Sequence, residues 1–446
     1  MKVCYYNHTG KVSGAEKVLF TMLAKMGSGF EISLIAPESA QIRAFCMKHG
    51  IHYLPVRELR ARFTINPLQL IHYGLSVMRV IFQVRALEKS LSPDLVHANS
   101  TRAGMVAFLA TIGSRTPIVW HIHDQFRRHP ISSAIRFLLA ASSRNSVVAV
   151  SQATAQGVRG KSGSKVASRV PIAVIYNGVD GSLYRERQGA VDNFLEAENL
   201  ADAPFRTVMV GQITARKGQL GAIQTFARLV DKDSPRAQLL IVGSPVFNHD
   251  EKYLQRLKDE VELLGIGGNV RFMGHRSDVA VVLQSSHLLI VNSSSEPFGL
   301  VLLEACACAT PVLASSVDGV PELIVDGVTG KLFPPKDLDA MLSAMRLLHN
   351  EREYAKNLGI AARERTLQHF SEQKFLEQMR QYYYSVVRGS PADAPIEQPG
   401  HFLQAGETGV NHIFPDGVPS GRSVSAFAVS RRSGSAAIVH AASKRM

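Results

Sequence analysis

The sequence predicts an α/β protein with two doubly wound parallel sheets. The chain has 446 residues, which is enough for two domains with separate cores. Short β-branched runs alternate with longer segments of helical period, a pattern typical of parallel sheets that helices cover on both faces. The alternation restarts near the middle, and two sets of about six strands favour two sheets over one very wide sheet.

The predicted strands are short apolar runs. In the first half they are expected at 3–7, 32–36, 94–98, 118–122, 147–150 and 174–176. In the second half they are expected at 207–211, 239–243, 270–273, 288–291, 312–314 and 331–333. Helical period lies between the strands, for example over 16–26 and 68–85.

The turn-prone stretch Asn177-Gly178-Val179-Asp180 follows an apolar strand and marks the expected domain boundary. We therefore expect a first domain over 1–177 and a second over 178–370. An amphipathic helix is predicted over about 371–387. Residues 388–446 are rich in Gly, Ser, Ala and Pro without a sustained period, which predicts a disordered tail.

Composition excludes several classes of protein. Apolar residues make up 46% of the chain and charged residues 20%, as in ordinary globular proteins. No run of about 18 apolar residues occurs, and the chain turns polar too early for a secretory signal. The four cysteines do not form a disulfide framework and suit a reducing compartment. We expect a cytoplasmic protein, not a secreted mini-protein, a membrane span or a fibrous repeat.

The charge is concentrated in one half of the chain. Residues 1–185 hold 23 Lys and Arg against 8 Asp and Glu, a net charge of +15. Residues 186–387 hold 21 against 25, a net charge of −4. A basic half favours an anionic, extended partner such as nucleic acid, an acidic membrane surface or a phosphorylated substrate.

The strongest local pattern is a strand, a polar loop and a helix over 287–306. The loop carries Glu296 and the helix carries Glu304, eight positions later. Free amides at a helix start form an anion site, and ligands of open parallel sheets bind beyond the carboxyl ends of the strands. The two carboxylates could accept hydrogen bonds from hydroxyls of one polyhydroxylated ligand. Taken alone, such glutamates are more often a capping acid and a solvated helix position, so both interpretations stay open.

Two further loops carry candidate side chains. Arg216 and Lys217 follow the first strand of the second half and could clamp a diphosphate, although such a pair is more often solvated surface. His121 and His123, two apart at a strand end, could form half of a metal site, but no further ligand is obvious. A His-Asp pair with Asp124 lining a cleft is favoured, and either histidine could instead be a satisfied loop residue. The spacings are neither those of a Walker loop nor of a dinucleotide fingerprint.

These pieces occur together and in order, and the chain over about 1–387 resembles the retaining GT-B glycosyltransferases of glycosyltransferase family 4. The matching segments are Ser13-Gly14-Ala15-Glu16, His123-Asp124, Val150-Ser151, Asn177-Gly178-Val179-Asp180, Gly211…Arg216-Lys217-Gly218 and Ser294-Ser295-Glu296-Pro297-Phe298-Gly299-Leu300…Glu304…Gly319-Val320-Pro321-Glu322. The resemblance implies two Rossmann-like domains that face each other across a cleft, with the last helix packed back on the first domain.

The resemblance also implies roles for individual residues. Arg216 and Lys217 would hold the diphosphate of a nucleotide-sugar donor and stabilise the leaving group. Glu304 would bind the ribose, Glu296 the transferred sugar, and His123 would lie near sugar and acceptor. The other expected donor-site positions are Gly14, Gly211, Phe298, Gly299 and Leu300. On the acceptor side the expected positions are His121, Asp124, Arg127, Arg128 and Asn177.

The implied reaction moves a hexose from a UDP- or GDP-sugar with retention of configuration, through a front-face, oxocarbenium-like step, without a metal or another cofactor. Three positions depart from the family pattern, which often has glycine where this chain has Ser13, Ala309 and Asp318. None of them removes a charged group that the mechanism needs.

The acceptor is expected to be a glycan or a lipid-linked molecule of cell-envelope or exopolysaccharide synthesis. Arg57, Arg60 and Arg62 precede an amphipathic helix whose apolar face has Leu68, Ile71, Leu75, Met78 and Phe82. This pattern favours contact with an anionic surface at the inner face of a membrane, or else packing of the helix on its sheet. Nucleic acid is not expected as a partner, because no recognition motif occurs. A nucleotide-sugar epimerase or a sugar-phosphate synthase of the same fold is the nearer alternative.

Overall fold

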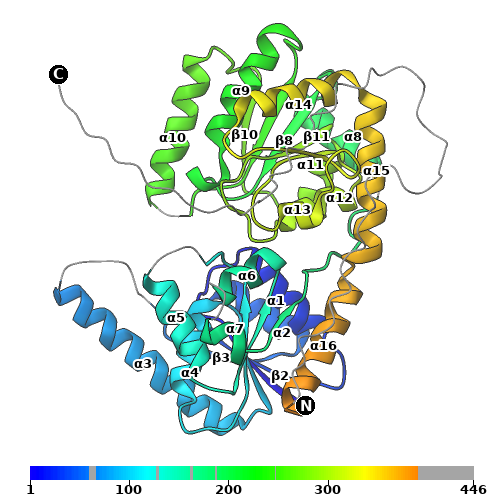
Figure 1. Ribbon diagram of the computed structural model, residues 1–446. Helices are drawn as coiled ribbons and strands as arrows, with labels where there is room; N and C mark the ends of the chain where they lie inside the picture. The colour runs from blue at the N-terminus through cyan, green and yellow to red at the C-terminus, as the bar shows by residue number, and fades with distance from the viewer. Residues whose placement is uncertain (60–66, 127–129, 161–163, 186–187, 247, 390–446) are drawn as a thin grey trace, which may run out of the picture. The chain divides into compact units, whose positions relative to one another are not determined.

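The computed structural model describes residues 1–59, 67–126, 130–160, 164–185, 188–246 and 248–389, and it contains two parallel β-sheets (Figure 1). The first sheet has seven strands in the order β3-β2-β1-β4-β5-β6-β7, and the second has six in the order β10-β9-β8-β11-β12-β13. In both sheets the order reverses beside the first strand of the set, as in doubly wound folds. The α/β prediction is confirmed.

The first sheet is built from strands that agree with the predicted runs to within two residues at each end. They are β1 (Lys2–Tyr6), β2 (Glu31–Pro37), β3 (His52–Val56), β4 (Leu95–Ala98), β5 (Ile118–Ile122), β6 (Asn145–Ala149) and β7 (Ile172–Val174). The helices between them are α1 (Gly14–Lys25), α2 (Ala40–His49), α3 (Pro67–Leu91), α4 (Thr101–Ala110), α5 (Pro130–Ala140), α6 (Gln152–Arg159) and α7 (Lys165–Arg169). The exception is β3, which the sequence pattern does not predict.

The reason for this miss is local. Strand β3 reads His-Tyr-Leu-Pro-Val, so His52 and Pro55 interrupt the apolar run. Proline is tolerated in an edge strand because its missing N–H can face away from the ladder. The strand pairs only with β2 in the observed order, which is where such a sequence belongs.

The second sheet repeats the design. Its strands are β8 (Arg206–Val210), β9 (Gln238–Val242), β10 (Val270–Gly274), β11 (Leu288–Val291), β12 (Val312–Ser315) and β13 (Lys331–Phe333). Its helices are α8 (Gln188–Ala197), α9 (Gln219–Lys232), α10 (Asn248–Leu263), α11 (Val279–Gln284), α12 (Leu300–Ala307), α13 (Val320–Leu323), α14 (Leu338–Asn350) and α15 (Arg352–His369).

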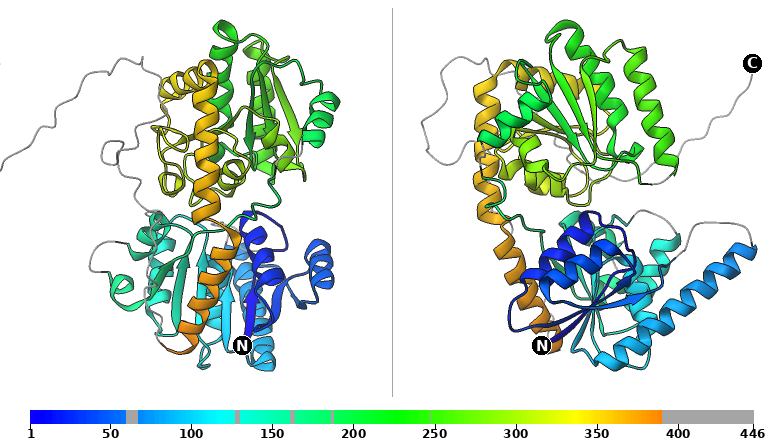
Figure 2. Two further views of the ribbon diagram at one scale, coloured as in Figure 1. Left: turned by 90° about the vertical axis from the view of Figure 1, so that its right-hand side faces the viewer. Right: turned by 180° about the vertical axis from the view of Figure 1, so that it is seen from behind.

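Helices cover both faces of each sheet (Figure 2). Neighbouring strand residues therefore enter different cores: Tyr5 packs with Met22 of α1, whereas Tyr6 packs in the cluster that contains Val80 of α3. In the second sheet Leu239 and Leu240 divide in the same way between two clusters. Burial on both faces explains why the strands are continuous apolar runs and not alternating ones.

The last described helix, α16 (Glu372–Val387), packs on the first sheet. Its buried side chains Phe375 and Met379 join the same cluster as Tyr5, and the Tyr382 hydroxyl donates to the Val147 carbonyl oxygen at 3.2 Å. Beyond Gly389 the predicted tail lies outside the described residues. None of the helices in the described ranges combines the length and the apolar character that crossing a bilayer requires.

Candidate active site

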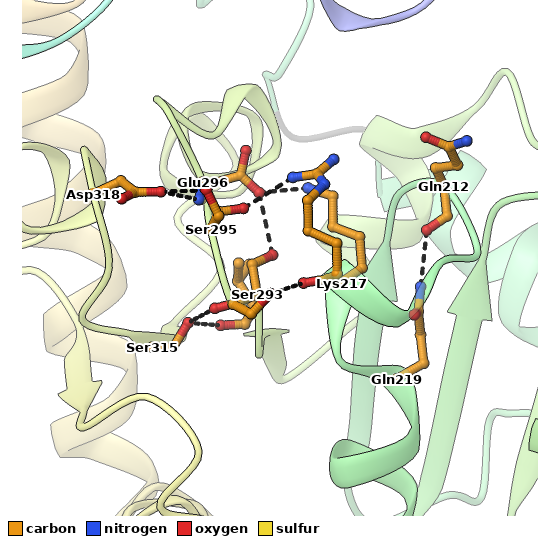
Figure 3. A network of polar contacts seen from close by, with 11 residues as sticks. Gln212, Lys217, Gln219, Ser293, Ser295, Glu296, Ser315 and Asp318 are labelled. Atoms are coloured by element: carbon orange, nitrogen blue, oxygen red, sulfur yellow. Dashed lines mark hydrogen bonds and ion pairs between the residues drawn. The ribbon is translucent and has the colours of Figure 1, made fainter. Parts of the chain in front are cut away.

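The loop between β11 and α12 holds Glu296. Gly299 caps the helix with φ of +97°, a conformation that glycine adopts without steric cost. The Ser315 hydroxyl donates to the Ser293 carbonyl oxygen at 2.7 Å, which ties the loop to the end of β12 (Figure 3). The loop therefore sits at the carboxyl edge of the sheet, where the sequence predicts it.

Glu296 is buried, with 7% of its surface exposed, and its carboxylate has two partners. Lys217 Nζ lies 2.5 Å from Oε2, and the Ser293 hydroxyl donates to the same oxygen at 3.2 Å (Figure 3). The structure thus brings together two of the predicted catalytic side chains from loops 79 residues apart in the chain. A positive charge held by a buried carboxylate is a preorganised partner for a second anion.

The loop after β8 interlocks with the loop after β11. Arg216 donates from Nη1 to the Ser295 carbonyl oxygen at 2.9 Å, and its own carbonyl oxygen accepts the Ser294 N–H at 2.8 Å. Gly218 has φ of +70°, and a Cβ there would lie 2.0 Å from the Asn292 carbonyl oxygen. The backbones approach so closely that only glycine fits at this position.

Asp318 braces the Glu296 loop from the other side. Its Oδ2 accepts the Ser295 hydroxyl at 2.6 Å and the Glu296 N–H at 2.8 Å (Figure 3). Its backbone is left-handed, with φ of +44°, where aspartate is better tolerated than most residues. In the sequence this position stands out only as a departure from glycine, whereas in the structure its carboxylate holds the loop that carries Glu296.

The loop after β8 and the start of α9 contain polar side chains that the sequence pattern did not single out. The Gln219 side-chain amide donates to the Gln212 carbonyl oxygen at 2.9 Å. Gln219 Oε1 and the Thr214 hydroxyl are buried and have no hydrogen-bond partner among the described residues. Gly211 has φ of +145°, and a Cβ there would lie 3.5 Å from Lys217 Cε. Buried polar atoms without protein partners are expected to bind water or a polar ligand.

The remaining positions predicted for the donor site lie in α12 or close to it. Phe298 is buried in the apolar core, so only its backbone can serve a ligand. Burial raises the pKa of Glu304, while Lys17 and a hydrogen bond from Tyr184 oppose that rise. Gly14, at the start of α1, is next to Leu300, since a Cβ on Gly14 would lie 3.3 Å from Leu300 Cδ1.

Around His123, which follows β5, the structure places a cluster of three imidazoles. The ring centroids of His121 and His123 are 4.1 Å apart, and those of His97 and His121 are 5.2 Å apart. Tyr383 of α16 and His97 share a hydrogen bond of 2.7 Å. Burial lowers the pKa of His123 to about 4 and that of His97 to about 3, so both are neutral at pH 7.

The other predicted acceptor-side positions differ in how far they are buried. His121 is fully buried behind His123, and neither of its ring nitrogens has a hydrogen-bond partner among the described residues. Asp124 is exposed, and Asn177 is buried. Arg127 and Arg128 lie outside the described residues. The described part of the chain contains no group of three or more His, Cys, Asp or Glu placed to hold a metal ion.

Two matched segments have structural roles. Glu322 accepts the N–H groups of Gln152 at 2.7 Å and Ala153 at 2.9 Å, and the Tyr176 hydroxyl at 2.9 Å. Ser151 donates its hydroxyl to the Pro297 carbonyl oxygen at 2.6 Å. These bonds link the start of α6 to α13 and to Pro297, the residue after Glu296. The Glu322 carboxylate offsets the unpaired amides at the start of α6.

Two doubly wound sheets, with charged and glycine-rich loops at the carboxyl edge of the second, define a GT-B protein. Residues 12–183 match the family model for Glycosyltransferase Family 4, and residues 191–365 match the model for Glycosyl transferases group 1. The chain belongs to the GT-B glycosyltransferases of family 4.

Known proteins agree with this assignment. The N-acetyl-alpha-D-glucosaminyl L-malate synthase of Bacillus anthracis is 27% identical over 334 residues, which cover 73% of this chain and 83% of that protein. The D-inositol 3-phosphate glycosyltransferase of Nocardia farcinica is 30% identical over 288 residues, or 60% of this chain and 61% of that one. The solved structure of Anabaena HepE with UDP and glucose has a TM-score of 0.73 at 23% identity and covers 86% of this chain and 100% of that one, which shows the shared fold.

Proposed function

We propose that this glycosyltransferase moves a hexose from a UDP- or GDP-sugar to a glycan or lipid-linked acceptor, with retention of configuration and without a metal. The observation that carries the proposal is the ion pair between Lys217 and the buried Glu296, together with the hydrogen bond from Arg216 to the Ser295 carbonyl oxygen. It puts two cations beside a carboxylate at the carboxyl edge of the second sheet, the edge where doubly wound sheets bind ligands.

In this proposal the two cations meet the diphosphate. Arg216 offers a planar fork and Lys217 a point charge, and both become more effective as negative charge develops on the leaving nucleotide. Two basic side chains can do the work that a divalent cation does in other nucleotide enzymes, which supports a reaction without a metal. Glu304, in the helix that follows, is the proposed partner of the ribose hydroxyls.

Glu296 is the proposed partner of the transferred sugar. One of its oxygens already holds Lys217 and Ser293, and the carboxylate can accept sugar hydroxyls and stabilise positive charge at the anomeric carbon. A front-face reaction of this kind needs no separate nucleophile. His123, neutral at pH 7, contributes a hydrogen bond to sugar or acceptor and not a charge.

The basic first half of the chain supports a proposal for the place of the reaction. We propose that the protein works in the cytoplasm at the inner face of a membrane, in cell-envelope or exopolysaccharide synthesis. The net charge of +15 over residues 1–185 supports an acceptor or a surface that is anionic.

The test is nucleotide release from a panel of UDP-, GDP- and ADP-sugars. We expect slow hydrolysis of one donor by the wild type and its loss in Glu296→Ala and Arg216→Ala. Arg228→Ala is the matched control, because Arg228 lies in the same half of the chain and its ion pair with Asp339 is exposed. Unchanged hydrolysis in both site variants would contradict the proposed site.

Configuration, metal and acceptor are tested separately. NMR of the released sugar or of the product would show whether the anomeric configuration of the donor is kept, and excess EDTA would show whether a metal is required. Sugar transfer that depends on an added second molecule distinguishes a glycosyltransferase from an epimerase that acts on the donor alone.

A further inference from the structure

Helix α3 is apolar on two opposite faces. The inner face packs against α4 and the first sheet through Val80, Ile81 and Val84, which are at most 8% exposed. This is the face that the core requires, and it differs from the one that the sequence pattern selected. Helix α3 therefore packs on its sheet, as one of the two alternatives held, but it does so through other residues than those of the predicted apolar face. Of that predicted face, the side chains of Leu68 and Ile71 lie outside the described set.

The outer face carries a second apolar stripe. Leu75 is 52% exposed, Met78 48% and Phe82 62%. Their spacing of three and four residues places them on one side of the helix. Single exposed apolar residues are common on protein surfaces, but three along one helical stripe indicate a surface that meets something apolar.

The polar residues beside this stripe are basic. The exposed positions between residues 72 and 90 include His72, Arg79 and Lys89 but no acidic side chain. The acid in this range, Glu88, is 4% exposed and accepts hydrogen bonds from Ser114 and Thr116. The outer face of α3 is therefore apolar and cationic.

A second helix of the same layer shows the same character. Helix α5 packs on α4, as α3 does (Figure 1). It exposes Phe137 to 73% and Ile131 to 43%. Its one charged residue, Arg136, is basic and donates to the carbonyl oxygens of Gly157 and Val158.

We propose that the outer face of α3 docks on an anionic lipid bilayer. An amphipathic helix with bulky apolar side chains and only basic charges lies in the headgroup region of such a membrane, where it buries the apolar residues and pairs the cations with phosphates. A second copy of this chain fits less well, because a symmetric contact would bring the same cations together. The docking itself does not depend on the proposed function. Only its biological purpose, which is to bring the enzyme to a lipid-linked acceptor, rests on that function.

The experiment is flotation of the full chain with vesicles of phosphatidylglycerol and, in parallel, of phosphatidylcholine. We expect binding to the anionic vesicles at low salt, weakening as salt rises, and little binding to the neutral ones. Phe82→Ser should weaken binding by about tenfold, because it removes several buried carbons. Leu263→Ser is the matched control, since Leu263 of α10 is 80% exposed and lies in the other half of the chain.

The charge contribution is tested by Arg79→Glu with Lys89→Glu, which should abolish the preference for anionic vesicles. Donor hydrolysis without vesicles should stay unchanged in Phe82→Ser, so a failure of docking is distinguishable from a failure of the proposed function. Equal binding to both vesicle types, no binding at low salt, or full binding by Phe82→Ser would overturn the proposal. A change of oligomeric state without vesicle binding would assign the stripe to self-association and also overturn it.

Discussion

Asp318 offers the sharpest test of how the loop that carries Glu296 is held. The Asp318 carboxylate accepts two hydrogen bonds from that loop, and its backbone is left-handed with φ of +44°. Three substitutions separate these properties. Asparagine keeps an acceptor and tolerates the backbone, glycine keeps only the backbone, and alanine keeps neither.

The expected stability changes follow from this division. Two hydrogen bonds to an exposed carboxylate contribute about 1 kcal/mol each. Glycine loses both but recovers about 1 kcal/mol from the relaxed backbone, so Asp318→Gly should cost about 1 kcal/mol in net free energy of unfolding. Asp318→Ala should cost about 2 kcal/mol or more, and Asp318→Asn about 0.5 kcal/mol. At about 2–4 °C per kcal/mol, the order in Tm is asparagine above glycine above alanine.

Activity should follow a different order. Both glycine and alanine free the Glu296 backbone, so both should lower kcat/KM for the donor by about tenfold or more, whereas asparagine should be close to wild type. Thermal unfolding and donor hydrolysis of the three variants would be compared side by side. Alanine as stable as glycine would refute the backbone argument, and full activity of Asp318→Gly would refute the role of the two hydrogen bonds.

Two other perturbations have defined outcomes. Gly218→Ala and Gly319→Ala should each destabilise the protein by about 2 kcal/mol or more, because a Cβ would lie 2.0 Å and 2.3 Å from a backbone oxygen; circular dichroism melts that match the wild type would contradict this. The lowered pKa values of His97 and His123 mean that the unfolded chain binds protons more readily than the folded one. Stability should therefore be full above about pH 6.5 and fall toward pH 4. His121→Phe removes a third buried imidazole, whose pKa burial also lowers, and should flatten that fall; an unchanged slope of Tm against pH would count against it.

The sequence was most informative about the strands and the order of the site loops. Apolar runs bounded by turn residues placed β5, β11 and β13 with the observed ends. The strand–loop–helix pattern around Glu296 was also visible, because a parallel sheet leaves its loops at the carboxyl edge. That Lys217 contacts Glu296 depends on the crossover between β8 and β11, which no local pattern encodes.

Two features of the fold could not be predicted from the sequence, because they depend on tertiary contacts. The hydrogen bonds of Asp318 reach a loop 22 residues away, and a lone aspartate in a loop carries no signal of such a contact. Helix α3 has apolar residues around most of its circumference, so its period could not show which face meets the sheet. Only the packing of Val80 and Val84 distinguishes the inner face from the exposed stripe.

The loops after β8 and β11 are the proposed binding site of the nucleotide diphosphate. Calorimetric titration of UDP and GDP into the wild type and Arg216→Ala, with Arg228→Ala as the control, tests this site most directly, because it measures the affinity for the nucleotide. The account predicts micromolar to millimolar binding of one nucleotide, weakened by about tenfold or more in Arg216→Ala and unchanged in the control. Equal affinity of the wild type and Arg216→Ala, or no binding of either nucleotide, would contradict it.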